Sequence, residues 1–316
     1  MHTRISRKNL QWVLFIVGLL ILAFFLYSSG LFENLDVFLE INIGLFFIAF
    51  LVSVVSIILK VFRWHYLSRE YGQPLTLYEA SVVSISGLFF ANITPGKIGD
   101  LYKAYYMKKR YAMNFLDGAS MIFYERFYEL LILFAVAMLV FVLVDIDNSM
   151  ILVLLLALVI LMGLYILYSK FDLIFGLAKK FLIRLPYIES QEDLDIHISK
   201  IDKRAIFWVI VISFASIFLE FVRLWIVTLA FGFKVDFVLL SVFFCLSIII
   251  GLVSQIPLGV GVMEGSLTFF LEKLDIPSTI ALAIVIADRV ISMYFALFIG
   301  FIFSKLSIDE MTGVES

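Results

Sequence analysis

The sequence predicts an all-α polytopic membrane protein that forms a single transmembrane domain over residues 1–316. Hydrophobic residues make up 63% of the chain and charged residues only 16%, and the mean hydropathy is +1.08. Several apolar runs exceed about 18 residues, the length that indicates a helix able to cross a bilayer. Two Pro/Gly motifs flanked by ionisable residues interrupt this apolar sequence.

Six apolar segments are long enough to be full helical spans, and we expect six such spans. They lie near residues 10–29, 42–62, 117–144, 149–169, 205–230 and 278–304. We predict that the first is a retained helix, because it is long for a signal peptide and no small-residue cleavage site follows it. Two further apolar stretches end in the Pro/Gly motifs, and a short amphipathic segment follows each. These stretches are 76–94, followed by 99–110, and 236–256, followed by 263–274.

The basic residues indicate how these segments cross the membrane. Arg4, Arg7 and Lys8 place the N-terminus in the cytoplasm, and the loop after the first span carries acidic residues but no basic residue. The basic run within 103–110 stays cytoplasmic only if 76–94 is one arm of a re-entrant hairpin. Residues 170–204 carry seven Lys and Arg residues and are expected to form a cytoplasmic interfacial segment. The same reasoning makes 236–256 a second re-entrant hairpin, open to the outside, with the C-terminus in the cytoplasm and the chain in the plasma membrane.

The charged residues occur twice at similar spacing from a proline. In the first half one arginine precedes the proline by 32 residues and another follows it by 31, and in the second half the separations are 34 and 32. These residues are Arg63, Pro95 and Arg126, and Arg223, Pro257 and Arg289. An ionisable residue at membrane depth persists only where it is paired or faces water. A duplicated pattern of this kind predicts inverted repeats, 10–144 and 149–304, with a binding site where their broken helices meet.

The first motif, residues 92–100, reads Asn-Ile-Thr-Pro-Gly-Lys-Ile-Gly-Asp. Proline removes a helical hydrogen bond and glycine permits left-handed turns, so the motif should break its helix. Backbone N–H groups freed near residue 99 would form an anion site, and Lys97 would add a charge suited to phosphate. The alternative is an ordinary cytoplasmic loop in which Lys97 is solvated.

The second motif begins at Pro257, and its glycines allow the backbone to approach a ligand or another helix closely. Glu264 follows near the start of the next helix, where the helix dipole favours a carboxylate. Glu264 is therefore either a site residue or simply a helix cap.

Two acid–arginine pairs lie deep inside their predicted spans. Glu125 and Arg126 are about nine residues, or roughly 13 Å, from the start of theirs, and Asp288 and Arg289 are about ten residues in. We expect Arg126 to pair with Glu129, three residues later, and also to face a partner helix or a substrate. A purely structural alternative pairs Arg126 with Asp288, and Arg289 with Glu125.

Arg63 and Arg223 lie on the spans that precede the two hairpins. Arg63 is either a site residue or a positive anchor at the cytoplasmic interface. Arg223 has Glu220 one turn away, and its alternative role is to snorkel to the external interface.

The motif residues resemble those of the lysylphosphatidylglycerol synthase transmembrane family, also called the flippase-like domain family. The first family motif, an Asn, Pro, Arg/Lys, Gly, Glu/Asp series, is matched by Asn92, Pro95, Lys97, Gly99 and Asp100. The second, Pro-Gly-Gly-x-Gly-x-x-Glu, is matched by Pro257, Gly259, Gly261 and Glu264, with Leu258 in place of the first glycine. The resemblance covers about residues 8–305.

Members of that family that carry a soluble aminoacyl-transferase domain make and flip aminoacylated lipids. The resemblance here implies the translocating module, because no such domain is found in this sequence. Relatives without the domain are associated with membrane-lipid or polyprenyl-linked glycan pathways in bacteria and archaea.

The leading hypothesis is a lipid flippase that moves an anionic or zwitterionic headgroup lipid, either a phospholipid or a polyprenyl-phosphate-linked sugar. The residues expected to bind the substrate are Arg63, Asn92, Pro95, Lys97, Arg126, Arg223, Pro257, Gly259, Gly261 and Arg289. The residues expected to form ion pairs or carry a coupled proton are Asp100, Glu125, Glu129, Glu220, Glu264 and Asp288.

Three other functions compete with this hypothesis. The first is an intramembrane lipid-modifying transferase with a donor pocket near Lys103 and Arg110; the others are an ion-coupled carrier of a soluble organic anion, and a scaffold whose charges only hold helices together. The expected partners are a membrane lipid and lipid-modifying or glycan-assembly enzymes, but not nucleic acid. Neither a metal nor a cofactor is expected, because His65 and His197 have no second ligand at metal-binding spacing.

Overall fold

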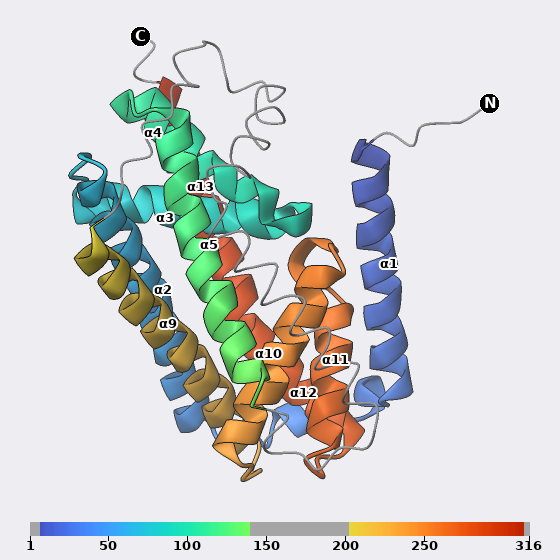
Figure 1. Ribbon diagram of the computed structural model, residues 1–316. Coiled ribbons are helices and arrows are strands. Elements are labelled where there is room, and N and C mark those ends of the chain that lie inside the picture. The colour runs from blue at the N-terminus through green and yellow to red at the C-terminus, as the bar shows by residue number, and fades with distance from the viewer. Residues whose placement is uncertain (1–6, 140–201, 313–316) are drawn as a thin grey trace.

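The computed structural model describes residues 7–139 and 202–312, and these residues contain helices and no strands (Figure 1). The predicted span at 149–169 lies outside the described residues, as does nearly all of the predicted interfacial segment 170–204.

Three helical stretches are long and apolar enough to cross a membrane: Ile43–Glu70, Arg204–Ala230 and Ser278–Thr312. The first two correspond to α2 (Ile43–Glu70) and α9 (Lys203–Ala230). The third is a continuous run of α12 (Ser278–Arg289), a short π-helix (Val290–Tyr294) and α13 (Phe295–Thr312). The chain is therefore an integral membrane protein, as predicted.

Two other predicted spans are also helical. Helix α1 (Arg7–Ser28) and helix α5 (Phe115–Ala137) occupy the segments expected near 10–29 and 117–144. Helix α5 has the length of a span but is not one of the three stretches above, because Glu125, Arg126 and Glu129 lie in its middle.

Helices α2 and α9 pack side by side and run in opposite directions (Figure 1). At one end of the pair the backbone N–H of Asn42 donates to the carbonyl of Ala230 at 2.9 Å. Further along the pair, towards its other end, the guanidinium of Arg63 donates to the hydroxyl of Ser213 at 2.8 Å. Residue numbers thus rise along α2 as they fall along α9, which defines an antiparallel pair.

The same succession of elements occurs in both described parts of the chain, residues 7–139 (the first part) and residues 202–312 (the second part). Helices α2 and α9 each contain 28 residues, and the helices that follow, α3 (Leu77–Ile93) and α10 (Phe237–Val253), each contain 17. A Pro/Gly corner comes next, then a short helix, α4 (Tyr102–Tyr111) or α11 (Val262–Glu272). Last comes a helix that carries the acid–arginine pair, α5 or α12.

Both Pro/Gly motifs break their helices, as predicted. The first corner, η3 (Pro95–Leu101), turns through Gly96 and Lys97, which have positive φ angles of 60° and 57°. Gly99 must be glycine for a different reason, because a Cβ atom there would lie 2.0 Å from the carbonyl oxygen of Phe90. The resulting turn packs directly on the end of α3.

The second corner, η5 (Pro257–Gly259), turns through Leu258 with a φ of 64°. Glycine adopts this conformation without strain, whereas a leucine does so only at a cost. The two corners meet, since a Cβ atom on Gly96 would lie 2.4 Å from the side-chain oxygen of Gln255.

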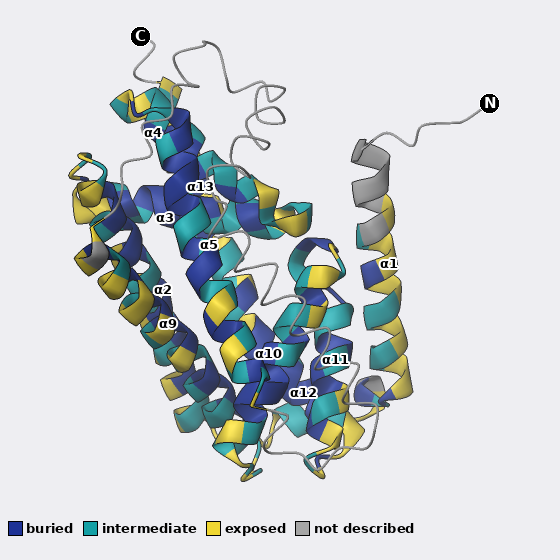
Figure 2. Cartoon of the chain, viewed as in Figure 1, coloured by how far each residue is buried: buried dark blue, intermediate teal, exposed yellow. Residues whose placement is uncertain are grey.

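Buried residues line the inner faces of the helices, while exposed residues cover their outer faces (Figure 2). Many of the exposed residues on α2 and α9 are large and apolar, among them Phe62, Phe214 and Phe218. Such an apolar outer surface is suited to lipid, because the hydrocarbon core of a bilayer has no water to solvate exposed polar groups.

Candidate functional site

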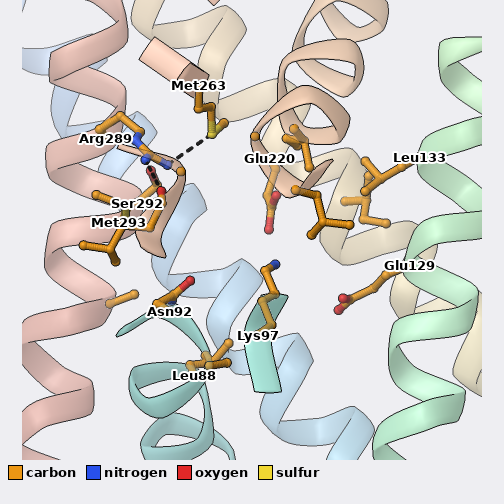
Figure 3. Close-up of a pocket in the computed structure, with 18 of the residues that line it drawn as sticks. Leu88, Asn92, Lys97, Glu129, Leu133, Glu220, Met263, Arg289, Ser292 and Met293 are labelled. Carbon is orange, nitrogen blue, oxygen red and sulfur yellow. Dashed lines mark hydrogen bonds between the residues drawn. The ribbon is translucent and has the colours of Figure 1, made fainter. Parts of the chain in front are cut away.

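A cavity of about 240 Å³ lies between the two corners, and helices α2, α3, α5 and α9 to α13 contribute to its lining. Side chains from both described parts of the chain point into it (Figure 3). Its ionisable lining residues are Lys60, Lys97, Arg126, Glu129, Glu220, Arg223, Asp288 and Arg289.

Six residues of the first part form a closed ring of alternating charge, which we call the six-residue ring. In order around the ring, the N···O distances are Arg63–Glu125 3.0 Å, Glu125–Lys103 2.5 Å, Lys103–Asp100 3.1 Å, Asp100–Arg126 2.6 Å, Arg126–Glu129 2.6 Å and Glu129–Arg63 2.7 Å. The ring joins α2, η3, α4 and α5, so it fixes the first corner against three helices. It includes the predicted pair between Arg126 and Glu129.

The ring is largely buried, and this explains why it is closed. Removing one partner from a buried ion pair leaves an uncompensated charge in a medium of low dielectric constant, which is strongly destabilising. In the ring every carboxylate has two cationic neighbours and every cation has two carboxylate neighbours. The Lys103 ammonium also lies 4.6 Å from the centre of the Trp64 ring, a favourable cation–π contact.

The second part contains ion pairs without a closed ring. Arg223 donates through Nε and Nη2 to the two carboxylate oxygens of Asp288, at 2.7 and 3.1 Å. Arg289 donates through Nε to Glu264 at 2.8 Å and through Nη2 to the carbonyl of Leu258 at 2.6 Å. The other oxygen of Glu264 accepts from the backbone N–H of Gly261 at 2.7 Å. Glu264 is therefore both a helix cap and an ion-pair partner.

The two parts use equivalent residues for equivalent pairs. The arginine of α2 or α9 pairs with the acid beside the second arginine, and that second arginine pairs with the acid that follows the Pro/Gly corner. The pairs are Arg63–Glu125 with Arg126–Asp100, and Arg223–Asp288 with Arg289–Glu264. The alternative that paired Arg126 with Asp288, and Arg289 with Glu125, is therefore wrong for this conformation.

The predicted alternatives for the first arginine of each part are also wrong. Arg63 is only 2% exposed and Arg223 only 4%, so neither is an interfacial anchor or a snorkelling side chain. Each is fixed by carboxylates inside the bundle.

One ion pair joins the two parts. The ammonium of Lys60 on α2 lies 2.6 Å from a carboxylate oxygen of Glu220 on α9. Lys60 stands three residues before Arg63, and Glu220 stands three residues before Arg223. Equivalent positions thus carry opposite charges where the two antiparallel helices cross beside the cavity.

The structure separates the predicted site residues into those that line the cavity and those that support it. The lining residues are Asn92, Lys97, Arg126, Glu129, Glu220, Arg223, Gly259, Asp288 and Arg289. The supporting residues, in the corners or behind the lining, are Arg63, Pro95, Asp100, Glu125, Pro257, Gly261 and Glu264.

The predicted site residues did not include Lys60 or Lys103. Lys60 has a signal in the sequence, since its position before Arg63 matches that of Glu220 before Arg223. The sequence places Lys103 in a cytoplasmic basic run, and the transferase alternative places it near a donor pocket. It is instead 3% exposed and paired with Asp100 and Glu125.

Lys97 differs from the other ionisable residues of the cavity. Its side chain extends into the cavity, toward the region between Glu129 and Glu220 (Figure 3). Within residues 7–139 and 202–312, the side chain of Lys97 has neither a hydrogen bond nor a carboxylate within 4.0 Å.

The fold and the cavity together define an integral membrane protein with a charged chamber between broken helices. The chain belongs to the family described as the lysylphosphatidylglycerol synthase TM region, which matches residues 11–300. It is 26% identical to a UPF0104 membrane protein of Methanothermobacter thermautotrophicus, with 84% of each chain aligned. It is 24% identical to a UPF0104 membrane protein of Methanocaldococcus jannaschii, with 99% of each chain aligned.

Proposed function

We propose that this protein is a lipid flippase that admits the anionic or zwitterionic headgroup of a phospholipid or polyprenyl-phosphate-linked sugar to the cavity. The acyl or prenyl chains remain in the surrounding lipid throughout. The protein acts as a transporter and not as an enzyme, in the plasma membrane, with both termini in the cytoplasm.

The observation that carries this proposal is the cavity lined by Lys97, Arg126, Arg223 and Arg289, from both parts of the chain. A charged phosphate crosses a hydrocarbon layer only where the protein replaces its lost hydration with matched charges. A volume of about 240 Å³ suits a headgroup better than a whole lipid. Membership of a family described by its lipid-synthase transmembrane region supports the same substrate class.

We propose further that the two parts are inverted repeats which open the cavity to opposite leaflets in turn. The antiparallel α2 and α9 and the matched element lengths support this relation. The Lys60–Glu220 pair is the contact that changes during the cycle, because it alone among the ion pairs found in the described residues joins the two repeats.

The proposal is tested by reconstituting the protein in vesicles that contain tail-labelled phospholipid. The rate at which inner-leaflet label becomes accessible to an external quencher reports translocation. We expect Arg126→Ala and Arg289→Ala to abolish the protein-dependent rate, because each removes a cation from the cavity wall.

The exposed Lys273 provides a matched control, since it lies outside the cavity and Lys273→Ala also removes one cation. All variants must be recovered from the membrane as folded protein, as judged by their elution from a sizing column. Normal translocation by both arginine variants would contradict the proposed function.

A further inference from the structure

The charges in and directly behind the cavity do not balance. The cations of the described residues are Lys60, Arg63, Lys97, Lys103, Arg126, Arg223 and Arg289, and the carboxylates are Asp100, Glu125, Glu129, Glu220, Glu264 and Asp288. Seven cations thus face six carboxylates. The six-residue ring contains three of each, and the remaining three carboxylates each pair with one cation.

The unmatched charge belongs to Lys97. Every other cation in this set lies within 4.0 Å of a carboxylate. The ammonium of Lys97 extends into the cavity instead, from a residue held in the left-handed region at the first corner (Figure 3). An unmatched cation at membrane depth is unfavourable, so the cavity has one positive charge to offer to a ligand.

A second donor group also faces the cavity with a weak partner. The Nη1 of Arg289 donates to the thioether sulfur of Met263 at 3.1 Å (Figure 3). Sulfur in a thioether is a poor acceptor, whereas a phosphate oxygen forms a strong charge-assisted hydrogen bond with a guanidinium. A ligand phosphate therefore gains by replacing Met263, and Lys97 supplies the compensating charge from the opposite corner.

We infer that the cavity selects a headgroup of a single net negative charge, a phosphodiester monoanion with an uncharged polar substituent. Binding such a headgroup makes the set of charges neutral. A zwitterionic headgroup leaves the excess positive charge of Lys97 in place, and a phosphomonoester, which carries close to two charges, leaves an excess negative charge. Discrimination follows because an uncompensated charge in a site of low dielectric constant is disfavoured.

This inference rests on the proposed function, and it is tested first by binding. The ligands are short-chain phosphatidylglycerol, phosphatidylethanolamine and phosphatidic acid with identical tails, titrated calorimetrically into the detergent-solubilised protein. We expect phosphatidylglycerol to bind at least about tenfold more tightly than the other two. A like charge or an unpaired charge in the site costs more free energy than a tenfold change in affinity represents.

Two substitutions at one position separate charge from shape. Lys97→Gln should abolish the preference for phosphatidylglycerol over phosphatidylethanolamine, whereas Lys97→Arg should preserve it. Both variants should fold, because Lys97 is not part of the six-residue ring or of any ion pair among the described residues. A glycerol phosphodiester without tails distinguishes a lipid site from a site for a soluble anion. Stronger binding of the tailed ligand indicates a lipid site. Equal binding of the two ligands retains the selectivity for a monoanion but favours the organic-anion carrier.

The same lipids, tail-labelled and placed in vesicles, separate the two proposals. A binding preference without movement of any lipid would contradict the flippase and leave the charge selectivity standing. Movement of all three lipids at equal rates, equal binding of all three, or an unchanged preference in Lys97→Gln would overturn the charge selectivity.

Discussion

At the scale of single residues, the six-residue ring explains how one corner of a membrane protein can carry so many charges. Its members come from three separate stretches of the sequence, yet each occupies a place where both neighbours in the ring have the opposite charge. A ring of this kind is stable only when it is complete, since any missing member exposes two others to a medium that solvates charge poorly.

The ring therefore predicts a large effect of Glu125→Ala on stability. The substitution leaves Arg63 and Lys103 each without one buried partner, and we expect a loss of about 3–5 kcal/mol in the free energy of unfolding. Thermal unfolding in detergent measures the loss, and Glu272→Ala on the exposed face of α11 is the matched control. Equal stability of the two variants would show that the ring does not support the corner.

The Lys60–Glu220 pair predicts a coupling between the two parts of the chain. Because both side chains are partly exposed to the cavity, Lys60→Gln and Glu220→Gln should each destabilise the protein only modestly. The double variant should lose less than the two losses added together, with a coupling of about 1 kcal/mol. A double-mutant cycle of unfolding free energies checks this, and strict additivity would argue against the pair.

At the scale of elements, helix α1 is held to the second corner by close backbone approach. A Cβ atom on Gly261 would lie 2.2 Å from the carbonyl oxygen of Gly18, and Gly261 also has a positive φ of 80°. Gly265, one turn further along, would meet the ring of Phe25 on α1 at 2.0 Å. These glycines allow α1 to pack directly against η5 and α11.

This packing predicts that Gly261→Ala is much more damaging than Gly232→Ala. Both glycines have a positive φ, 80° at Gly261 and 84° at Gly232, so alanine suffers backbone strain at either position. Only Gly261 adds a clash with α1, because a Cβ atom on Gly232 has nothing within 4 Å. The unfolding midpoints should therefore differ by more than the strain alone, and equal midpoints would contradict direct packing of α1 on the corner.

Much of the element order follows from the sequence, because apolar length and helix-breaking residues are local signals. The expected spans at 42–62 and 205–230 became Ile43–Glu70 and Lys203–Ala230, and both Pro/Gly motifs broke their helices. The duplicated pattern of prolines and charged residues also identified most of the ionisable residues that line the cavity.

The partners of these residues could not be predicted in the same way. Arg63 and Lys103 looked like cytoplasmic cations because they lie next to other basic residues in the sequence. Only the packing of α2, α4 and α5 brings them to Glu125, and no local pattern specifies that packing. Arg126 and Glu129 were predicted as a pair because their contact depends on helical spacing alone.

At the scale of the whole molecule, the antiparallel arrangement of α2 and α9 predicts that their C-terminal ends lie on opposite sides of the membrane. Cys245 is the only cysteine in the sequence and is buried, so a single cysteine introduced at an exposed position reports one side. Glu70→Cys should react with an impermeant maleimide from the cytoplasmic side, and Lys234→Cys should react from outside. Labelling of both from the same side would contradict the inverted orientation of the two parts.

The central claim is that the charged cavity carries a lipid headgroup across the membrane. Its most direct test is the exchange of tail-labelled phosphatidylglycerol between leaflets in vesicles that contain the native protein, measured with an external quencher of the label. We predict that the quencher reaches the inner-leaflet label in protein-containing vesicles and only the outer-leaflet label in protein-free vesicles. If the inner-leaflet label stays protected in both, the cavity is not a path for this headgroup.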